Sequence, residues 1–335
     1  MELWFLVLLL VLGCLAIYVV LSVFLLRNPH LLHHKIHLQF SARNIAHRGG
    51  CGEKLESTME AFNHAKAVGA DMFELDCHMT KDGHVIVSHD GNLLRQTGVD
   101  VDISSLNLQD LSGPSGPLYK ENLEVTFNIG HYSSGEDRRF VLLEDVFKAF
   151  PSMPINIEVK EDNDQLIQKV ASLVKSYGRD AITVWASERD NLMNKCREQN
   201  PDMPFSFTIE RSLQLLILFY TGLLPFISLR ETLLQFYLPR IFNRKYTPEH
   251  RELRTRLGAF LYDKLTMRKA LFEHLVKRGM QVHLFVCNED SDIQAAFDAG
   301  ATGVMSDYPT LLSDWLRRHP DPVPAIAEAE RKKNC

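Results

Sequence analysis

Apolar and polar positions follow three different patterns along the chain. Residues 4–26 carry no charged side chain, and a second long apolar stretch lies within residues 213–242. Between about residues 41 and 319, short runs rich in β-branched residues alternate with stretches that repeat apolar residues at helical spacing. The runs that predict strands are residues 44–47, 72–78, 84–89, 155–160, 181–186, 204–209, 282–286 and 303–306.

Three of the intervening stretches carry helix signals. Ser57-Thr58-Met59-Glu60 is a capping box, and Gly69 suits the far end of the helix that follows it. Residues 164–177 and 267–278 place apolar residues on one face and are followed by glycine. Repeated strand–helix units favour an α/β fold of the (β/α)8 TIM-barrel type, whose usual size is about 250 residues. An open doubly wound sheet is the alternative, but no Gly-x-Gly-x-x-Gly loop follows the first strand.

The N-terminal apolar run predicts an N-terminal transmembrane helix. Its 23 residues would form a helix about 35 Å long, at about 1.5 Å per residue. A cleaved signal peptide is the alternative, but that segment has a basic leader and a shorter apolar stretch, whereas Met1-Glu2 precede this run. We therefore expect a retained single-pass anchor. Arg27, Lys35 and Arg43 follow it, and this small basic bias leaves the orientation in the membrane open.

The patterns divide the chain into an anchor with its juxtamembrane linker (1–40), a barrel domain (41–319) and a C-terminal tail (320–335). The hydrophobic mid-chain insertion, residues 213–242, interrupts the barrel. Its uncharged part, 212–229, contains Pro225 and lies at the low edge of length for a second span. Between residues 213 and 256 there are seven Arg or Lys against three Glu. This balance favours a segment that rests in anionic headgroups and lets a single-chain lipid enter the site. A helical pair packed on the barrel is the alternative.

Composition and charge exclude several classes of protein. The chain is 45% hydrophobic and 24% charged, which is typical of globular proteins and not of disordered chains or coiled coils. Its formal net charge is −5, whereas a protein that neutralises nucleic-acid phosphates is normally basic. We therefore expect no nucleic-acid partner, and no feature of the sequence predicts a protein partner. The six cysteines lack the paired spacing of a zinc site or a disulfide framework.

Two expected strands present charged residues on one face. Glu74 and Asp76 are two positions apart, as are Glu158 and Lys160, and residues so spaced point the same way from a strand. Apolar residues occupy the opposite face of each strand. An inward carboxylate is costly unless it is paired or bound to a metal, so acids converging from separate strands suggest a cation site. Ordinary salt bridges at a barrel rim are the alternative.

Two histidines end the strands that lie on either side of the Glu74 and Asp76 pair in the sequence. His47-Arg48-Gly49-Gly50 follows the first strand, and His89-Asp90-Gly91 follows the strand over 84–89. A pair of histidines so placed is suited to act as general acid and base. The planar fork of Arg48 matches phosphate oxygens. His78 and His283 are interpreted as packing or orienting residues. Residues 112–139 are either a lid over the barrel mouth or an ordinary surface loop.

These motifs together resemble the glycerophosphodiester phosphodiesterase family. The resemblance rests on Ile45-Ala46-His47-Arg48-Gly49-Gly50, Glu56, Phe73-Glu74-Leu75-Asp76-Cys77-His78, Val87-Ser88-His89-Asp90, Asn156-Ile157-Glu158-Val159-Lys160 and the closing run Gly300 to Pro309. It covers about residues 41–315. The N-terminal span and the apolar insertion resemble the mammalian membrane-anchored lysophospholipase D branch, which implies a membrane location in the endoplasmic reticulum and perinuclear region.

The resemblance implies a role for each motif residue. His47 and His89 would be the acid/base pair. Glu74, Asp76 and Glu158 would bind a divalent cation, Ca²⁺ or Mg²⁺, which His89 could also touch. Arg48 and Lys160 would contact the substrate phosphate, and Glu56 and Phe285 would border the pocket. The family usually has Glu-Asn where this chain has Glu56-Ser57, and Trp where it has Phe285.

The activity implied is that of a phosphoric diester hydrolase acting as a lysophospholipase D. It would convert lysophosphatidylcholine, lysophosphatidylethanolamine or their N-acyl and alkyl lyso forms to lysophosphatidic acid and the head-group alcohol, with membrane lipids as its surroundings. Three alternatives stay open at this point. They are cleavage of deacylated glycerophosphodiesters, an activity like that of sphingomyelinase D or phosphatidylinositol phospholipase C, and a barrel that binds lipid without turnover.

Overall fold

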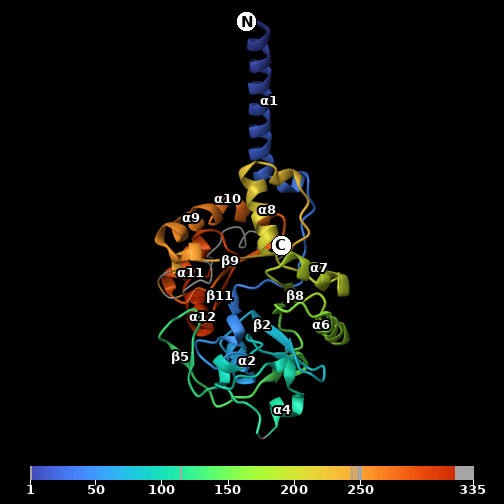
Figure 1. Cartoon of the computed structure of the whole chain (residues 1–335). Helices are drawn as coiled ribbons and strands as arrows, with labels where there is room; N and C mark the ends of the chain where they lie inside the picture. The colour runs from blue at the N-terminus through green and yellow to red at the C-terminus, as the bar shows by residue number, and fades with distance from the viewer. Residues whose placement is uncertain (1, 114, 243, 245, 247–250, 321–335) are drawn as a thin grey trace.

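The computed structural model describes residues 2–113, 115–242, 244, 246 and 251–320 (Figure 1). Almost all of the C-terminal tail predicted over 320–335 thus lies outside the described residues. The first helix, α1 (Glu2–Arg27), projects from one end of the molecule (Figure 1). Within the described residues, Leu3–Arg27 is the one helix long and apolar enough to cross a membrane, and only 6% of its most apolar window is buried.

Seven parallel strands form the main sheet: β1 (Asn44–Ala46), β2 (Met72–Met79), β7 (Ile155–Glu158), β8 (Thr183–Ala186), β9 (Leu233–Tyr237), β10 (Gln281–Phe285) and β11 (Gly303–Ser306). They pair in the order β8-β7-β2-β1-β11-β10-β9. The two outer strands approach one segment, because Trp185 is bridged to Phe205 and Leu233 to Ser206. The fold is therefore TIM-barrel-like, and isolated bridges stand where a strand over 204–209 was predicted.

The strand predicted over residues 84–89 is present but lies outside the parallel sheet, and the bounds predicted for the hydrophobic insertion were wrong. Residues 84–89 do not add a parallel strand, because β3 (Val85–Val87) pairs antiparallel with the end of β2 and with β6 (Val141–Leu142). Residues 233–237 are not part of the hydrophobic insertion. They form β9, which is buried between Ser206 and β10. Arg230 and Glu231 are the only charged residues between the uncharged part of the insertion and β9, and apolar residues resume at once, so hydrophobicity alone did not mark the strand.

Helices surround the sheet (Figure 1). Those that follow its strands are α2 (Met59–Ala67), α6 (Asp164–Ser176), α7 (Asp190–Gln199), α8 (Ile209–Tyr220), α9 (Arg256–Thr266), α10 (Lys269–Lys277), α11 (Asp290–Asp298) and α12 (Pro309–Arg318). The cap of α2 is Thr58, whose Oγ1 accepts from the amide of Ala61, and not the predicted Ser57. Most of these helices pack an apolar face on the strands, as in α6, where Leu166, Ile167 and Val170 are fully or almost fully buried.

Shorter elements complete the described chain. They are α3 (Leu94–Thr97), α4 (Leu108–Ser112), α5 (Leu143–Ala149), the hairpin of β4 (Leu123–Glu124) and β5 (Tyr132–Ser133), and single turns of 3-10 helix: η1 (Pro29–Leu31), η2 (His47–Gly49), η3 (Ile103–Ser105), η4 (Leu224–Phe226), η5 (Pro239–Ile241) and η6 (Arg251–Arg254). The segment with α4 lies at the end of the molecule far from α1 (Figure 1).

The last turns of α1 pack on the domain. Tyr18 Oη donates to the carbonyl of Thr221 at 2.6 Å, and Ser22 Oγ donates to that of Gly222 at 2.7 Å. On the other side, Lys277 Nζ donates to the carbonyl of Arg27 at 3.0 Å. The linker then passes the amino end of β10, where the amide of Ala42 donates to Gln281 Oε1 at 2.9 Å. Helix α1 is thus fixed to α10, to the loop after α8 and to the amino-terminal side of the sheet.

Candidate active site

Three carboxylates from two adjacent strands meet at the carboxyl end of the sheet. Glu74 and Asp76 lie on β2, and the pairing register sets Asp76 beside Glu158, the last residue of β7. One oxygen from each of the three lies within 4.8 Å of the others. Glu74 and Asp76 are buried, and Glu158 is partly exposed. The pairing of the strands therefore brings together the three acids that the sequence analysis proposed as metal ligands.

The electrostatics of this cluster suit a cation. Burial and then the negative charges of Asp76 and Glu158 raise the pKa of Glu74 well above its usual range. Burial, opposed by Lys160, raises the pKa of Glu158 to about 7. Although burial works against it, Lys160 lowers the pKa of Asp76, and its Nζ lies 2.7 Å from Asp76 Oδ1. Asp76 Oδ2 is buried without a hydrogen-bond donor in the described structure. Such an orphaned oxygen among crowded acids fits a ligand of a hard divalent cation.

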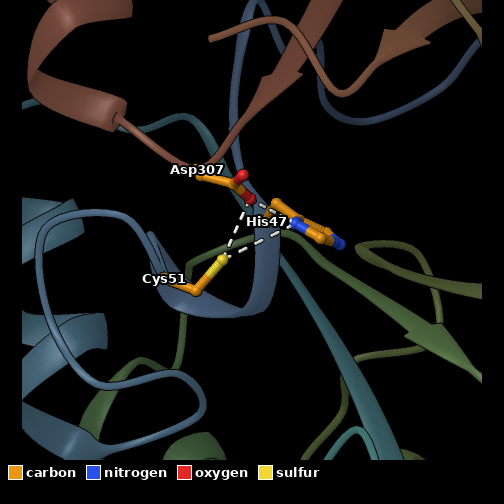
Figure 2. Close-up of side chains that lie close together, drawn as sticks. All are labelled: His47, Cys51 and Asp307. Atoms are coloured by element: carbon orange, nitrogen blue, oxygen red, sulfur yellow. Dashed lines mark hydrogen bonds and ion pairs between the residues drawn. The ribbon is translucent and has the colours of Figure 1, made fainter. Parts of the chain in front are cut away.

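His47 is held in place by Asp307, which the sequence analysis did not assign to the site. His47 opens η2 directly after β1, and its Nδ1 donates to Asp307 Oδ1 at 2.5 Å (Figure 2). Cys51 Sγ donates to the same oxygen at 2.9 Å, and Asn288 Nδ2 donates to Oδ2 at 2.7 Å. Burial would raise the pKa of Asp307, but the charge of His47 and these hydrogen bonds lower it. The arrangement leaves His47 Nε2 available, 3.9 Å from Glu74 Oε2.

His89 has the same kind of support from a different segment. It follows β3, and its Nδ1 lies 2.6 Å from Asp90 Oδ1, while Arg95 Nε donates to Asp90 Oδ2 at 2.6 Å. Burial, together with the positive charge of Arg48, lowers the pKa of His89 to about 4. Its imidazole is therefore neutral at neutral pH. Both histidines thus engage an aspartate through Nδ1, which fixes the tautomer that keeps Nε2 free for chemistry.

The two basic residues predicted to bind phosphate lie beside the carboxylate cluster. Arg48 is buried; its amide donates to Glu74 Oε2 at 2.9 Å, and its Nη1 donates to Glu56 Oε2 and to Thr126 Oγ1, each at 3.3 Å. Lys160 is held by Asp76. The charges of Arg95 and Arg48 outweigh burial and lower the pKa of Glu56 to about 2. Glu56 therefore lies behind Arg48 as its counter-ion.

Aromatic side chains line one side of the site. Phe127, from the loop predicted as a possible lid, meets the His47 ring edge-on at 5.5 Å between centroids. Phe127 also stacks on Tyr237 at 6.0 Å, and Tyr237 contacts Phe285 at 4.3 Å. Asn128 in the same loop donates to Tyr308 Oη at 2.8 Å. Part of the loop over 112–139 therefore covers the site, and Phe285 belongs to an aromatic wall.

Asp307, Asp90, Arg95 and Cys51 are the site residues whose roles sequence reasoning missed. Asp307 had a signal, because it stands directly after β11 in Ser306-Asp307-Tyr308-Pro309, at the same edge of the sheet as His47. Asp90 directly follows His89, the shortest spacing at which a carboxylate can reach the ring. His78 lies beside His89, since its Nε2 is 3.2 Å from the backbone carbonyl of His89.

Comparison with known proteins agrees with this geometry. Residues 47–311 match the Glycerophosphoryl diester phosphodiesterase family. The chain is 49% identical to human Lysophospholipase D GDPD3 over 90% of its length and 93% of that protein, and 47% identical to human Lysophospholipase D GDPD1 over 89% and 94%.

Solved structures of the family share the fold. The glycerophosphoryl diester phosphodiesterase domain of an uncharacterized Mycobacterium tuberculosis protein superposes with a TM-score of 0.62 at 19% identity, covering 83% of this chain and 99% of that domain. An Oleispira antarctica phosphodiesterase in complex with sn-glycerol-3-phosphate gives a TM-score of 0.58 at 17% identity, with 83% and 97% covered. With the family match over most of the chain, the resemblance and the enzyme class predicted from the sequence are confirmed: this chain belongs to the glycerophosphoryl diester phosphodiesterase family and is a phosphodiesterase.

Proposed function

We propose that this chain is a lysophospholipase D that hydrolyses lysophospholipids between the phosphate and the head-group alcohol. Lysophosphatidylcholine or lysophosphatidylethanolamine would yield lysophosphatidic acid and choline or ethanolamine. The observation that carries the proposal is the pair of aspartate-held histidines beside three clustered carboxylates. The substrate class is supported by the relatives that are 47–49% identical over about nine-tenths of the chain and are named lysophospholipases D.

The two histidines divide the proton transfers. His89 has a pKa lowered to about 4, so its neutral imidazole accepts the proton of the attacking hydroxyl group. His47, whose Nδ1 faces the ionised Asp307, gives a proton to the oxygen of the departing alcohol. The attacking group is water, or a neighbouring glycerol hydroxyl that forms a cyclic phosphate for water to open. In each step one P–O bond forms and one breaks, and the proton lost by the nucleophile balances the proton gained by the departing oxygen; the cyclic route has two such steps.

Glu74, Asp76 and Glu158 would hold a divalent cation, Ca²⁺ or Mg²⁺, which supplies neutralisation of the phosphodiester charge. Arg48 and Lys160 add positive charge on either side of these acids and are placed to bind phosphate oxygens. The aromatic wall of Phe127, Tyr237 and Phe285 offers apolar surface to the lipid.

We further propose that α1 is a retained anchor that holds the enzyme in a membrane, with the endoplasmic reticulum as its location. A removable leader makes no lasting contact with the folded domain. Here Tyr18 and Ser22 donate to the carbonyls of Thr221 and Gly222, and Leu25 is buried. These contacts support a helix that is part of the mature fold.

Substrate profiling of the purified full chain tests the proposed activity. We expect choline release from lysophosphatidylcholine that a chelator suppresses by at least about 100-fold, since the cation is expected to contribute several kcal/mol. Ca²⁺ or Mg²⁺ should restore it. Cleavage of glycerophosphocholine alone would replace the proposal with the alternative of a glycerophosphodiesterase. Chelator-resistant cleavage would contradict the assigned role of the carboxylates.

Asp307→Asn tests whether Asp307 positions His47. An amide presents either oxygen or NH2 to Nδ1, so the ring loses its fixed tautomer, and we expect kcat to fall about 10- to 100-fold with KM little changed. Asp307→Glu, which keeps the charge, should recover part of the loss. The measurement is steady-state kinetics beside a thermal unfolding midpoint. A fall explained entirely by lower folded fraction would assign Asp307 a structural role instead.

A further inference from the structure

The part of α1 that is free of the domain on every side is too short to cross a bilayer. Residues 3–17 are all exposed, and at about 1.5 Å per residue they extend about 22 Å. From Tyr18 onward one side of the helix contacts the domain, while residues 19–21, 23 and 24 stay exposed. The hydrocarbon core of a bilayer is about 30 Å thick and needs about 20 residues. The next turn must therefore complete the span, and this turn contains Tyr18 and Ser22, which are bonded to Thr221 and Gly222. The loop after α8 consequently lies at the boundary of the hydrocarbon.

The side chains of the loop after α8 suit the boundary between hydrocarbon and headgroups. Leu223, Phe226 and Ile227 are 43%, 38% and 38% exposed, although each is a large apolar residue. The Phe226 ring stacks beside Tyr18, with 6.4 Å between centroids. Tyrosine and other aromatic residues are enriched where hydrocarbon meets headgroups. The loop and α1 therefore present a joint apolar surface at the depth that the length of α1 requires.

Two helices continue this surface along the domain. On α8, Leu213, Ile217 and Tyr220 are spaced four and three residues apart on one face; on α9, Leu257, Leu261 and Leu265 are spaced four apart. Each of the six is about half exposed or more. Tyr220 Oη joins the helices by donating to the carbonyl of Leu265 at 2.9 Å. We call these six residues the α8–α9 face. Water-facing helices normally present polar residues outward, so a paired apolar face marks a contact surface.

Basic residues border the α8–α9 face. Three basic residues, Arg256, Lys264 and Arg268, are exposed on α9 or just after it. The acidic residues in the same stretch are two, Glu252 and Asp263. Lys264 Nζ lies 5.5 Å from the Phe260 ring centroid, and the Arg268 guanidinium lies 6.0 Å from that of Tyr220. Cations that extend from an apolar helix face are placed to reach anionic headgroups while their stems stay among apolar groups.

We propose that the α8–α9 face, with Leu223, Phe226 and Ile227, rests in the interfacial layer of the bilayer that α1 crosses. The partner is a lipid surface, with a preference for anionic headgroups. The proposal rests on the retained anchor of the proposed function and not on the proposed substrate. It extends the sequence-based prediction of an interfacial insertion to α9, and it assigns β9, which that prediction included, to the sheet.

Site-directed spin labelling tests this surface in the full chain. Cys14→Ser with Cys335→Ser leaves four native cysteines, each of them buried. A nitroxide is then placed at Ile217→Cys or Leu261→Cys, and the chain is reconstituted in nanodiscs of phosphatidylcholine and phosphatidylserine. The matched control is Gln109→Cys, which is exposed on α4 at the end far from α1 (Figure 1). The readout is accessibility to oxygen, which concentrates in lipid, relative to a water-soluble nickel chelate.

We expect the oxygen-to-nickel ratio at positions 217 and 261 to exceed that at position 109 several-fold, and to rise further with the phosphatidylserine fraction. Equal ratios at all three positions would overturn the proposal. The thermal unfolding midpoint of each labelled chain, compared with that of the unlabelled chain, shows that the domain is folded. Because the label reports surroundings and not turnover, lipid-like accessibility without lysolipid cleavage would support this surface and contradict only the proposed substrate.

Discussion

Replacing His47 by alanine should lower kcat for lysophosphatidylcholine about 10²- to 10⁴-fold, the usual contribution of a positioned acid or base. The change removes the imidazole whose Nδ1 is held by Asp307 and whose Nε2 faces the carboxylate cluster. KM should change far less, because Arg48 and Lys160, the proposed phosphate-binding residues, remain in place. The measurement is initial-rate kinetics of choline release at saturating metal.

A control variant and two related variants accompany the His47→Ala measurement. His37→Ala, in the exposed linker, should retain full activity. His89→Ala should lose about as much as His47→Ala, and the double variant should lose little more than either, because groups that act in one proton-transfer sequence are not additive. Full activity of His47→Ala in folded protein would remove the acid/base assignment.

Asp76→Asn should abolish both cleavage and the stabilisation of the fold by divalent ions. Asp76 Oδ2 is buried without a donor, and an amide offers a weaker ligand in its place. In the unaltered chain, an ion at about 100 times its Kd should raise the free energy of unfolding by about 2.7 kcal/mol over the chelated protein. Thermal unfolding with and without Ca²⁺ or Mg²⁺ measures this directly, and Glu198→Gln on the surface of α7 is the matched control.

The same stabilisation should depend on pH. Burial raises the pKa of Glu158 to about 7 and that of Glu74 well above its usual range, so the ion-free cluster holds protons at neutral pH. A bound cation must displace them, so affinity increases as pH rises through about 7 and decreases below it. Ion-dependent stabilisation that survives in Asp76→Asn, or that is strongest in acid, would contradict a site built on these carboxylates.

Much of the carboxylate cluster was predictable because strand geometry is local. Residues two apart in a strand share a face, so Glu74 and Asp76 had to point together. Glu158 joins them because β7 pairs directly with β2, a neighbour relation that the sequence did not reveal. Asp307 was not predictable in the same way. It reaches His47 across 260 positions of sequence, through the pairing of β1 with β11, which no local pattern reveals.

The strand β9 shows the limit of hydrophobic patterns. Between the uncharged part of the insertion and the strand residues Leu233, Leu234 and Phe236 lie only Arg230, Glu231 and Thr232, which give no turn signal. The stretch over 213–242 therefore contains two kinds of structure. The outward apolar residues of α9 were also missed, because periodicity predicts a helix face but not whether that face meets protein or its surroundings. Both distinctions depend on which segments pack together in the folded chain.

The docking of α1 has a mechanical consequence. A domain joined to its membrane anchor by a flexible linker can rotate freely, so its active site faces every direction in turn. Here the carbonyls of Thr221, Gly222 and Arg27 take part in hydrogen bonds that clamp the helix to the domain on two sides. In the proposed anchored state helix and domain would move together, so a tilt of the helix in the lipid would turn the active site with it, and the thickness of the bilayer would set the direction in which that site faces.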